Sequence, residues 1–418
     1  MATQGGYGGY GGYGGYGGYG GYGGYGGYGG YGGYGGLAIG LDAGLVARGA
    51  PAPYDPALSA GMLSAADGIA VPWAPVAPRP GRALDDPANL ALWAPWVRGF
   101  ILSTEILPRL AFDVQEDGAH GIEISELEER PKRDGLPAML VKAPLVRIDA
   151  PGDAAFAEQM KLVRAYADLR VDRQAEIVSQ LGFPTPYFGT IVSLHPARDA
   201  CALELIAAMQ GLAATVSMRV KHALACRRPD ELSHQIMPMI PTPGHGAFPA
   251  AHAAEAFAVA DLLKMLLAAA RAHAPRCAPA AETAQAVNAA LDRQAARISA
   301  NRVVAGVHFP VDGFAGAVLG RCLAAHLARR AGWEAAEARF WTFDGARLRN
   351  AADDFDPHEI TPPDAAPGLR ETPRDDPQSP SELSCEAVEA RGVGVSKPLR
   401  WLWDKAVEEL AARMEGRP

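Results

Sequence analysis

Residues 301–312 read NRVVAGVHFPVD and bring an arginine, a histidine and an aspartate into one short stretch of chain. Gly306 and Pro310 lie between these three residues, and both residue types interrupt a regular backbone. We expect one helix to end near Arg302 and another to start at Pro310, because proline is favoured in the first turn of a helix. Such a stretch can direct a cation, an imidazole and a carboxylate at one point.

The aspartate of this stretch, Asp312, lies four positions after the histidine, His308. It is close enough to accept the second ring N–H of His308, which would fix the tautomer and raise the basicity of the other ring nitrogen. Alternatively, Asp312 is a helix-start carboxylate that stabilises a local turn. The two roles are compatible.

A second segment, residues 221–229, reads KHALACRRP. Lys221 and Arg228 are seven positions apart. This spacing is two turns of helix, so we expect both side chains to project from one face, about 10 Å apart along the axis, toward a common anion. Pro229 is expected to end this helix. Taken alone, the pair also describes an exposed basic helix end that complements the helix dipole.

A third segment, residues 241–252, reads PTPGHGAFPAAH and precedes apolar residues at helical spacing. We expect His252 in the first turn of that helix, where unpaired backbone N–H groups and the helix dipole favour an anion. A histidine there can face a bound oxyanion, although an exposed or core imidazole has the same pattern. His245 alone indicates only a loop histidine.

Apolar periodicity elsewhere predicts an all-α helical bundle with at most a small β-hairpin, within residues 121–148, and long irregular straps. Trp93, Trp96 and Phe100 are expected to anchor the first helix of the bundle in the core. Five segments are expected: a disordered tail (1–36), an extended Pro/Ala/Gly-rich strap (37–89), a helical body with the motif segments (90–345), an irregular acidic Pro-rich segment (346–390) and a C-terminal docking helix (391–418).

The tail repeats Gly-Gly-Tyr from Gly5 to Gly36 without a charged or aliphatic side chain. Glycine loses the most backbone entropy on ordering, and isolated tyrosines bury too little surface to offset this loss. We favour a repeat tail that has no role in the structure or function of the folded part. The alternative is an array of aromatic groups that self-associate.

Composition limits the classes of partner. The net charge of −8 argues against nucleic acid. The five cysteines are scattered without disulfide or metal-ligand spacing, which indicates a reducing compartment. No secretory signal is visible, and the longest apolar stretches look too short or too charged to cross a membrane. We therefore expect a cytoplasmic protein without an integral membrane segment, and a homo-oligomer is possible.

Together the three segments resemble the superfamily of vanadium-dependent haloperoxidases and type 2 phosphatidic-acid phosphatases. The shared pattern is lysine, six residues, arginine-proline; then proline, two small residues, histidine; then arginine, five residues, histidine, three residues, aspartate. The resemblance covers residues 221–320 in both order and internal spacing. It implies a bundle of the haloperoxidase/acid-phosphatase type.

The resemblance also implies a role for each matching residue. Lys221, Arg228 and Arg302 would clamp the equatorial oxygens of phosphate or vanadate. His308, oriented by Asp312, would be the nucleophile on phosphorus or the single protein ligand to vanadium. Further residues implied are His252 as general acid and base, Ala250 and Ala251 as oxyanion contacts, and His245 at the place of an additional bromoperoxidase histidine. The cofactor would be vanadate in a haloperoxidase and none in a phosphatase.

The chain departs from the family pattern at Ala250 and Ala251, where the family usually has Ser-Gly. Loss of the serine hydroxyl would cost about 1 kcal/mol of oxyanion binding. If the glycine position requires a positive φ, Ala251 adds strain of about 1 kcal/mol. Weakened anion affinity is therefore expected, and a degenerate, non-catalytic member with a self-associating tail is a further alternative.

Between the two chemistries, the sequence favours a vanadate-dependent haloperoxidase-like enzyme that oxidises halide with hydrogen peroxide. Lipid phosphatases of the superfamily span the bilayer with their catalytic helices, whereas this chain offers no clear span. The aromatic Phe309 after His308 also resembles the haloperoxidases. The alternative is a soluble acid phosphatase that hydrolyses phosphate monoesters through a phosphohistidine, because it would use the same residues.

Overall fold

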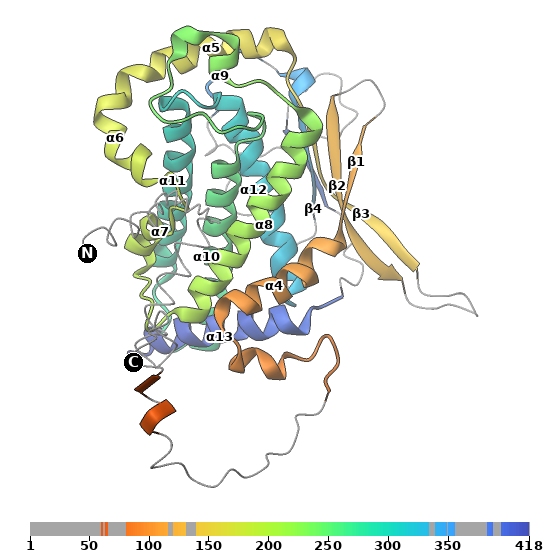
Figure 1. Ribbon diagram of the computed structural model, residues 1–418, viewed down its shortest axis with the longest axis vertical. Helices are drawn as coiled ribbons and strands as arrows, with labels where there is room; N and C mark the ends of the chain where they lie inside the picture. The colour runs from red at the N-terminus through yellow and green to blue at the C-terminus, as the bar shows by residue number, and fades with distance from the viewer. Residues whose placement is uncertain are drawn as a thin grey trace.

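The computed structural model describes residues 60–61, 63–65, 81–115, 120–130, 139–333, 339–348, 350–355, 383–387 and 394–417. These residues form a helical bundle with a sheet along one side (Figure 1). The Gly-Gly-Tyr tail, and most of the straps expected at 37–89 and 346–390, lie outside the described residues.

The centre of the bundle is α10 (Ala251–His273), and the predicted helical architecture is confirmed. It packs against α8 (Ala200–Leu224), α11 (Ala281–Val304) and α12 (Pro310–Arg330). Most side chains of α10 and α12 are buried, since both helices are rich in alanine, leucine and valine. Around them lie α4 (Pro95–Ile106), α5 (Asp153–Tyr166), α6 (Arg170–Ser179), α7 (Thr185–Val192), α9 (Pro229–Leu232), α13 (Lys397–Met414) and the 3-10 turns η1 (Pro87–Leu92), η2 (Leu107–Arg109), η3 (Ala167–Leu169), η4 (His234–Ile236) and η5 (Gly345–Arg347).

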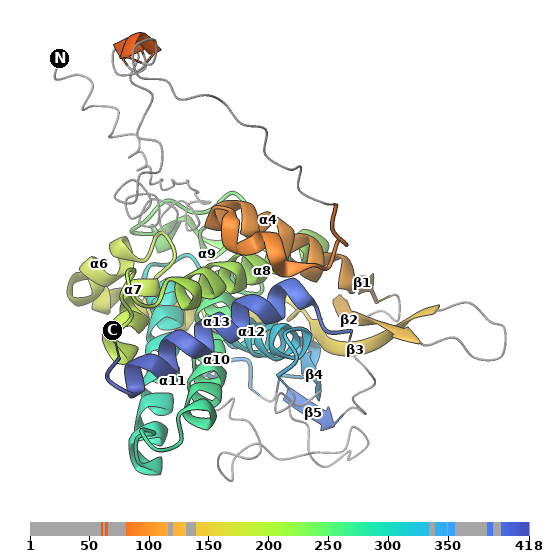
Figure 2. The same ribbon diagram turned by 90° about the horizontal axis from the view of Figure 1, so that it is seen from below.

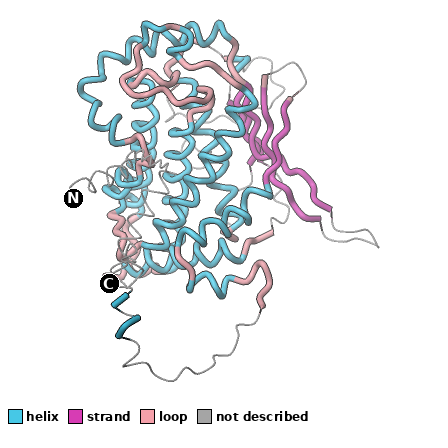
Figure 3. The backbone as a smooth tube through the Cα atoms, in the orientation of Figure 1, coloured by secondary structure: helices cyan, strands magenta, loops and turns pink. Residues whose placement is uncertain are grey.

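The sheet is larger than the single hairpin that the sequence predicts (Figure 3). Its five strands lie in the order β1 (Leu110–Val114), β2 (Gly121–Arg130), β3 (Met139–Asp149), β4 (Arg339–Asp344) and β5 (Leu383–Ala387). The antiparallel pair β2–β3 is the expected hairpin, whereas β4 runs parallel to β3 with Trp341 opposite Val146. Residues 340–343 are visible in the sequence only as an aromatic cluster, because a strand partner so distant along the chain leaves no local pattern.

The first helix of the body is present as α4, but its predicted anchors are wrong. Its three aromatic residues are exposed, namely Trp93 before the helix and Trp96 and Phe100 within it. The face of α4 that meets the body carries the buried Leu102 and Ile106. It also carries Arg98, whose Nε lies 2.7 Å from Oε1 of Glu204 on α8. A helix face that is held by an ion pair is not detected by apolar periodicity.

The C-terminal helix α13 lies across α8 and α10 (Figure 2). Glu409 of α13 accepts the backbone N–H groups of Cys201 and Ala202 at distances of 2.9 and 3.0 Å. Both N–H groups belong to the first turn of α8, where no partner within the helix exists and the dipole favours a carboxylate. This contact joins α13 to the body of the same chain.

Two helical segments are long and apolar enough to cross a membrane by length and composition, Ala200–Leu232 and Pro310–Arg330. The sequence predicts no confident membrane span, and two segments that pass by length and composition alone are weak evidence against that prediction. Their most apolar windows are 67% and 94% buried inside the protein. Packing against neighbouring helices accounts for this apolar composition, as in the core helices of other bundles.

Two glycines of α12 allow it to lie very close to α10. A Cβ atom at Gly320 would lie 2.3 Å from the carbonyl oxygen of Ala254, and one at Gly316 would lie 2.4 Å from that of Ala250. Both contacts are with backbone, which cannot move aside as a flexible side chain can. The two glycines therefore set the distance between the start of α10 and the start of α12.

We predict that Gly320→Val lowers the free energy of unfolding by about 1–3 kcal/mol or more, because the new side chain forces α10 and α12 apart. Urea denaturation measures the change. The matched control is Gly152→Ala before α5, where φ is −75° and no atom lies within 4 Å of the added Cβ. The control should stay within about 0.5 kcal/mol of the wild type, and an equally mild effect at Gly320 would contradict the close packing.

Candidate active site

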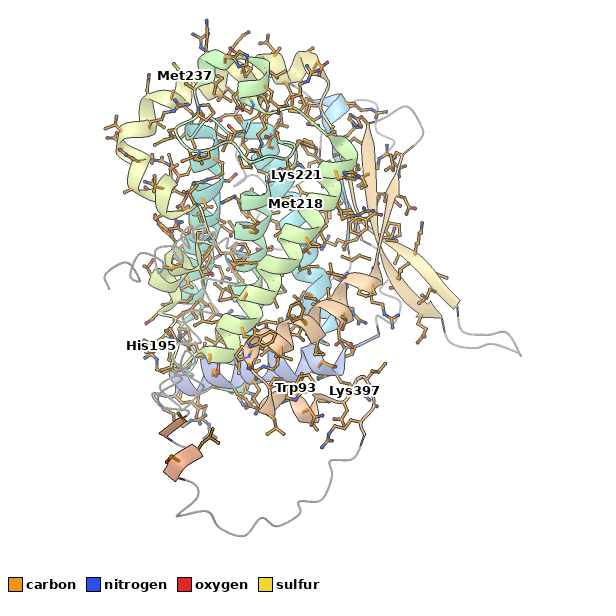
Figure 4. The ribbon with its side chains drawn as sticks, viewed as in Figure 1. Trp93, His195, Met218, Lys221, Met237 and Lys397 are labelled. Carbon is orange, nitrogen blue, oxygen red and sulfur yellow. The ribbon has the colours of Figure 1, made fainter. Side chains whose placement is uncertain are left out.

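The three motif segments meet at one end of the bundle. They contribute the last turns of α8 with the chain that follows, the first turn of α10, and the link between α11 and α12. Figure 4 places Lys221 in the part of α8 that is nearer to α9. Five predicted site residues with a titratable side chain are between 0% and 4% exposed, namely Lys221, Arg228, Arg302, His308 and Asp312.

The link between α11 and α12 forms the predicted histidine–aspartate pair. Nδ1 of His308 lies 2.8 Å from Oδ2 of Asp312, and the same oxygen accepts the backbone N–H of Phe309 at 3.0 Å. Asp312 therefore serves as both ring partner and helix-start carboxylate. Gly306, with φ at +84°, makes the turn, and Pro310 begins α12 as expected.

The partner of Nδ1 determines which ring nitrogen of His308 is basic. Because a carboxylate oxygen accepts from Nδ1–H, the lone pair lies on Nε2. Nη1 of Arg228 lies 3.2 Å from this Nε2. Burial first, and then the charges of Arg228 and Lys221, hold the pKa of His308 well below its usual value. The imidazole is therefore neutral and nucleophilic near pH 7.

Arg228 reaches the cluster by a different route from the predicted one. Helix α8 ends at Leu224 because Ala225 adopts a left-handed conformation with φ at +46°. Arg228 is then extended, and Pro229 begins α9 instead of ending α8. The predicted shared helix face of Lys221 and Arg228 is therefore wrong, although both side chains join the same cluster.

Lys221 and Arg228 hold the loop that leads into α10. Nζ of Lys221 donates to the carbonyl oxygens of Gly246 (2.8 Å) and Ala247 (2.6 Å). Nε of Arg228 donates to the carbonyl oxygen of His245 at 2.9 Å, and its Nη2 lies 3.2 Å from the ring Nδ1 of His245. His245 thus lies at the exposed edge of the cluster, in contact with one of the cations.

Arg302, in the last turn of α11, is 1% exposed and only partly paired. Its Nη2 donates to Oε1 of Gln180 at 3.0 Å and to the carbonyl oxygen of Ile177 at 3.3 Å. Its Nε and Nη1 have no hydrogen-bond partner among the described residues. Unpaired donors on a buried charge are costly, and they match the acceptor oxygens of a phosphate or a vanadate.

His252 lies in the first turn of α10, as predicted, and is half-buried. Its Nε2 is 2.9 Å from the carbonyl oxygen of Gln180, the residue that caps the C-terminus of α6. Gln180 is fully buried and touches both His252 and Arg302. The sequence motifs did not reveal Gln180, because it lies about seventy residues before His252 at an ordinary helix end.

Ala250 and Ala251 form the start of α10 without strain. Ala251 is helical and does not have a positive φ, so the strain expected there is absent. The backbone N–H of Ala250 donates to the carbonyl oxygen of Asp312 at 2.8 Å and is therefore already engaged. Only the lost hydroxyl remains as a consequence of the departure from Ser-Gly.

Burial perturbs every charge of the cluster. It lowers the pKa of Arg228 and of Arg302 to about 10, and lowers that of Lys221 further below its usual value. Burial also raises the pKa of Asp312 to about 7, so this carboxyl only partly neutralises the cations near pH 7. A cluster of this kind favours an anion. Among the described residues no group of three or more His, Cys, Asp or Glu side chains could hold a metal ion.

We predict that Arg302→Met raises the free energy of unfolding of the ligand-free protein by about 1 kcal/mol or more, because it removes a buried and partly unpaired charge. Orthovanadate should raise the melting temperature of the wild type, since a ligand at about 100 times its Kd adds about 2.7 kcal/mol. The variant should lose this response.

The matched control is Arg297→Met on the same helix, where Arg297 is half-exposed and paired with Glu176 at 2.6 Å. It should keep the full response to orthovanadate. Thermal melts of the three proteins with and without the anion decide the question. A wild-type response in Arg302→Met would contradict the assignment of Arg302 to the anion.

Comparison with known families agrees with this geometry. Residues 200–335 match the model of the PAP2 superfamily. No match to a curated protein was found. The matched range runs from the start of α8 to just past the end of α12 and contains every motif residue of the cluster. Through residues 200–335, the chain is similar to the PAP2 superfamily.

Proposed function

We propose that this chain is a vanadate-dependent haloperoxidase that oxidises halide with hydrogen peroxide. Members of the PAP2 superfamily are typically phosphoesterases or haloperoxidases, and the match to its model supports an enzyme that binds an oxyanion. The observation that carries the proposal is Arg302, whose two unpaired donor atoms are buried in a cluster with two further cations. The extent of burial favours a small resident oxyanion over an ester with a large leaving group.

The residues present fit vanadate. Lys221, Arg228 and Arg302 would bind its oxygens, and Nε2 of His308 carries the lone pair that a metal ligand needs. When bound, vanadate would activate hydrogen peroxide toward attack by a halide. Asp312 keeps the proton of His308 on Nδ1, which leaves Nε2 available as a ligand.

His252 is suited to proton transfer beside the bound anion. If its Nε2–H donates to the carbonyl oxygen of Gln180, Nδ1 is the basic nitrogen. Burial, and then the charge of Arg302, lower the pKa of His252 to about 3. The ring is therefore neutral in the ligand-free protein. The negative charge of a bound anion would raise this pKa, and His252 would then take a proton from peroxide and return it later.

The second candidate function is hydrolysis of a phosphate monoester. The His308–Asp312 pair favours it, together with a second histidine, His252, near enough for its charge to act on His308. Nε2 of His308 would form a bond to phosphorus while the ester P–O bond breaks. The negative charge of the bound phosphate would favour the protonated form of His252, which would give its proton to the leaving oxygen. Water would then cleave the P–N bond and release phosphate. The two functions share a site because vanadate has the shape of the phosphoryl-transfer transition state.

We predict that the purified full chain oxidises bromide or iodide with peroxide only after orthovanadate is added. Hydrolysis of p-nitrophenyl phosphate, assayed in parallel, should be weak or absent. His308→Ala should reduce oxidation by more than about 100-fold, because it removes the only nitrogen ligand assigned to vanadate. His234→Ala, an exposed histidine of η4, is the matched control and should remain active.

The opposite pattern would support the phosphatase, namely ester hydrolysis without orthovanadate and inhibition by it. The absence of both activities together with no binding of orthovanadate would indicate the degenerate member. Activity that persists in His308→Ala would contradict the site assignment for either chemistry.

A further inference from the structure

Helix α10 has a second titratable side chain in its first turns, Glu255. It lies three positions after His252, and residues at this spacing share a face of a helix. The side chain is only 5% exposed, although most of its neighbours on α10 are alanine, leucine or valine. A buried carboxyl in such a helix requires an explanation, because an unpaired charge in the interior is costly.

The Glu255 carboxyl lies close enough to two cations of the cluster for their charges to act on it. The charged groups that act on it are Lys221 from α8 and Arg302 from α11, and none from α12 or α13 does so among the described residues. The influence is mutual, because the charge of Glu255 also acts on the pKa of Lys221 and of Arg302. The carboxyl nevertheless forms no hydrogen bond or ion pair with any described residue.

The start of α10 lacks a donor that the family pattern supplies. Ala250 has no hydroxyl, and its backbone N–H is engaged by the carbonyl oxygen of Asp312. An anion between Lys221 and Arg302 would therefore meet fewer donors from α10 than the Ser-Gly pattern offers. A protonated carboxyl on the same helix can fill this place, because it presents one O–H donor.

We propose that Glu255 is a further oxyanion-binding residue, whose neutral carboxyl donates a hydrogen bond to the anion held by Lys221 and Arg302. It takes the role of the hydroxyl that Ala250 lacks. This inference rests on the proposed function to the extent that an oxyanion binds in the cluster. It adds that the Glu255 carboxyl binds the anion only while it is protonated. When this carboxyl ionises, it loses its O–H donor and repels the anion.

The protonation of Glu255 is consistent with its position. Burial raises the pKa of Glu255 to about 8, and the charges of Lys221 and Arg302 only partly oppose this shift. Below that pH the carboxyl is a donor, whereas above it the carboxylate competes with the anion for both cations. Anion affinity should therefore fall as the pH rises through about 8.

The test measures the Kd of inorganic phosphate for the full chain by calorimetry, at about pH 6 and about pH 9. Glu255→Gln keeps a neutral donor at both pH values, and we expect it to bind like the wild type at the lower pH and about tenfold more tightly at the higher one. Glu255→Ala should bind about fivefold more weakly than the wild type at the lower pH. Ala250→Ser in the Glu255→Ala background should recover part of this loss.

At each pH, the Kd of the wild type divided by the Kd of Glu255→Gln reports the contribution of Glu255 to phosphate binding. Phosphate itself, Asp312 and Lys221 titrate in both proteins, so their contributions cancel in the ratio. A ratio that is the same at both pH values, in a wild type that binds phosphate, would overturn this inference alone. A wild type that binds neither phosphate nor orthovanadate would overturn the proposed function as well.

A second readout reports the carboxyl without any ligand. The folded pKa lies above the ordinary value of 4.5, so the folded state retains the proton while the unfolded state loses it. Stability is therefore lost as the pH rises from 4.5 to about 8. Glu255→Gln lacks this loss, and the excess of its melting temperature over that of the wild type should grow from about pH 4.5 to about pH 8 and then level off. A constant difference would show that Glu255 is not held neutral and would overturn the inference.

Discussion

The burial of three cationic side chains at one end of a helical bundle is the constraint on which the site depends. Lys221, Arg228 and Arg302 are each 1–2% exposed, and burying charge costs far more than the surface pairs elsewhere in the chain contribute. The protein offsets this cost with backbone carbonyl groups from the loop at residues 245–247, from Val307 and from Ile177. The irregular segments and the last turn of α6 can supply these carbonyl groups, because carbonyl groups in the interior of a helix are already engaged within it.

The remaining architecture holds this cation cluster against the two histidines. Close contact of α10 with α12, made possible by Gly316 and Gly320, sets His252 relative to His308. Helix α13 caps α8 through Glu409, and so supports the helix that carries Lys221. Gln180 brings the end of α6 onto both His252 and Arg302. None of these contacts takes part in the proposed reaction, yet each determines where a reacting group lies.

The site retains its cation cluster although the serine hydroxyl of the family pattern is absent. The replacement of Ser-Gly by Ala250 and Ala251 introduces no backbone strain and removes only a hydroxyl. Glu255 lies on the same helix among the same cations. Its neutral form could supply a donor from one turn further along α10. In this view, affinity for the oxyanion depends on pH in a way that a serine hydroxyl would not produce.

The sequence by itself determined those features of the site that depend on residues only a few positions apart. The His308–Asp312 pair, the start of α12 at Pro310 and the place of His252 in the first turn of α10 follow from spacing and from backbone preferences, and the structure has all three. Only the tertiary structure decided the route of Arg228, the pairing of β3 with β4, and the contacts of Gln180 and Glu255. These features depend on a left-handed alanine, or on contacts between distant segments, and neither leaves a periodic signal in the chain.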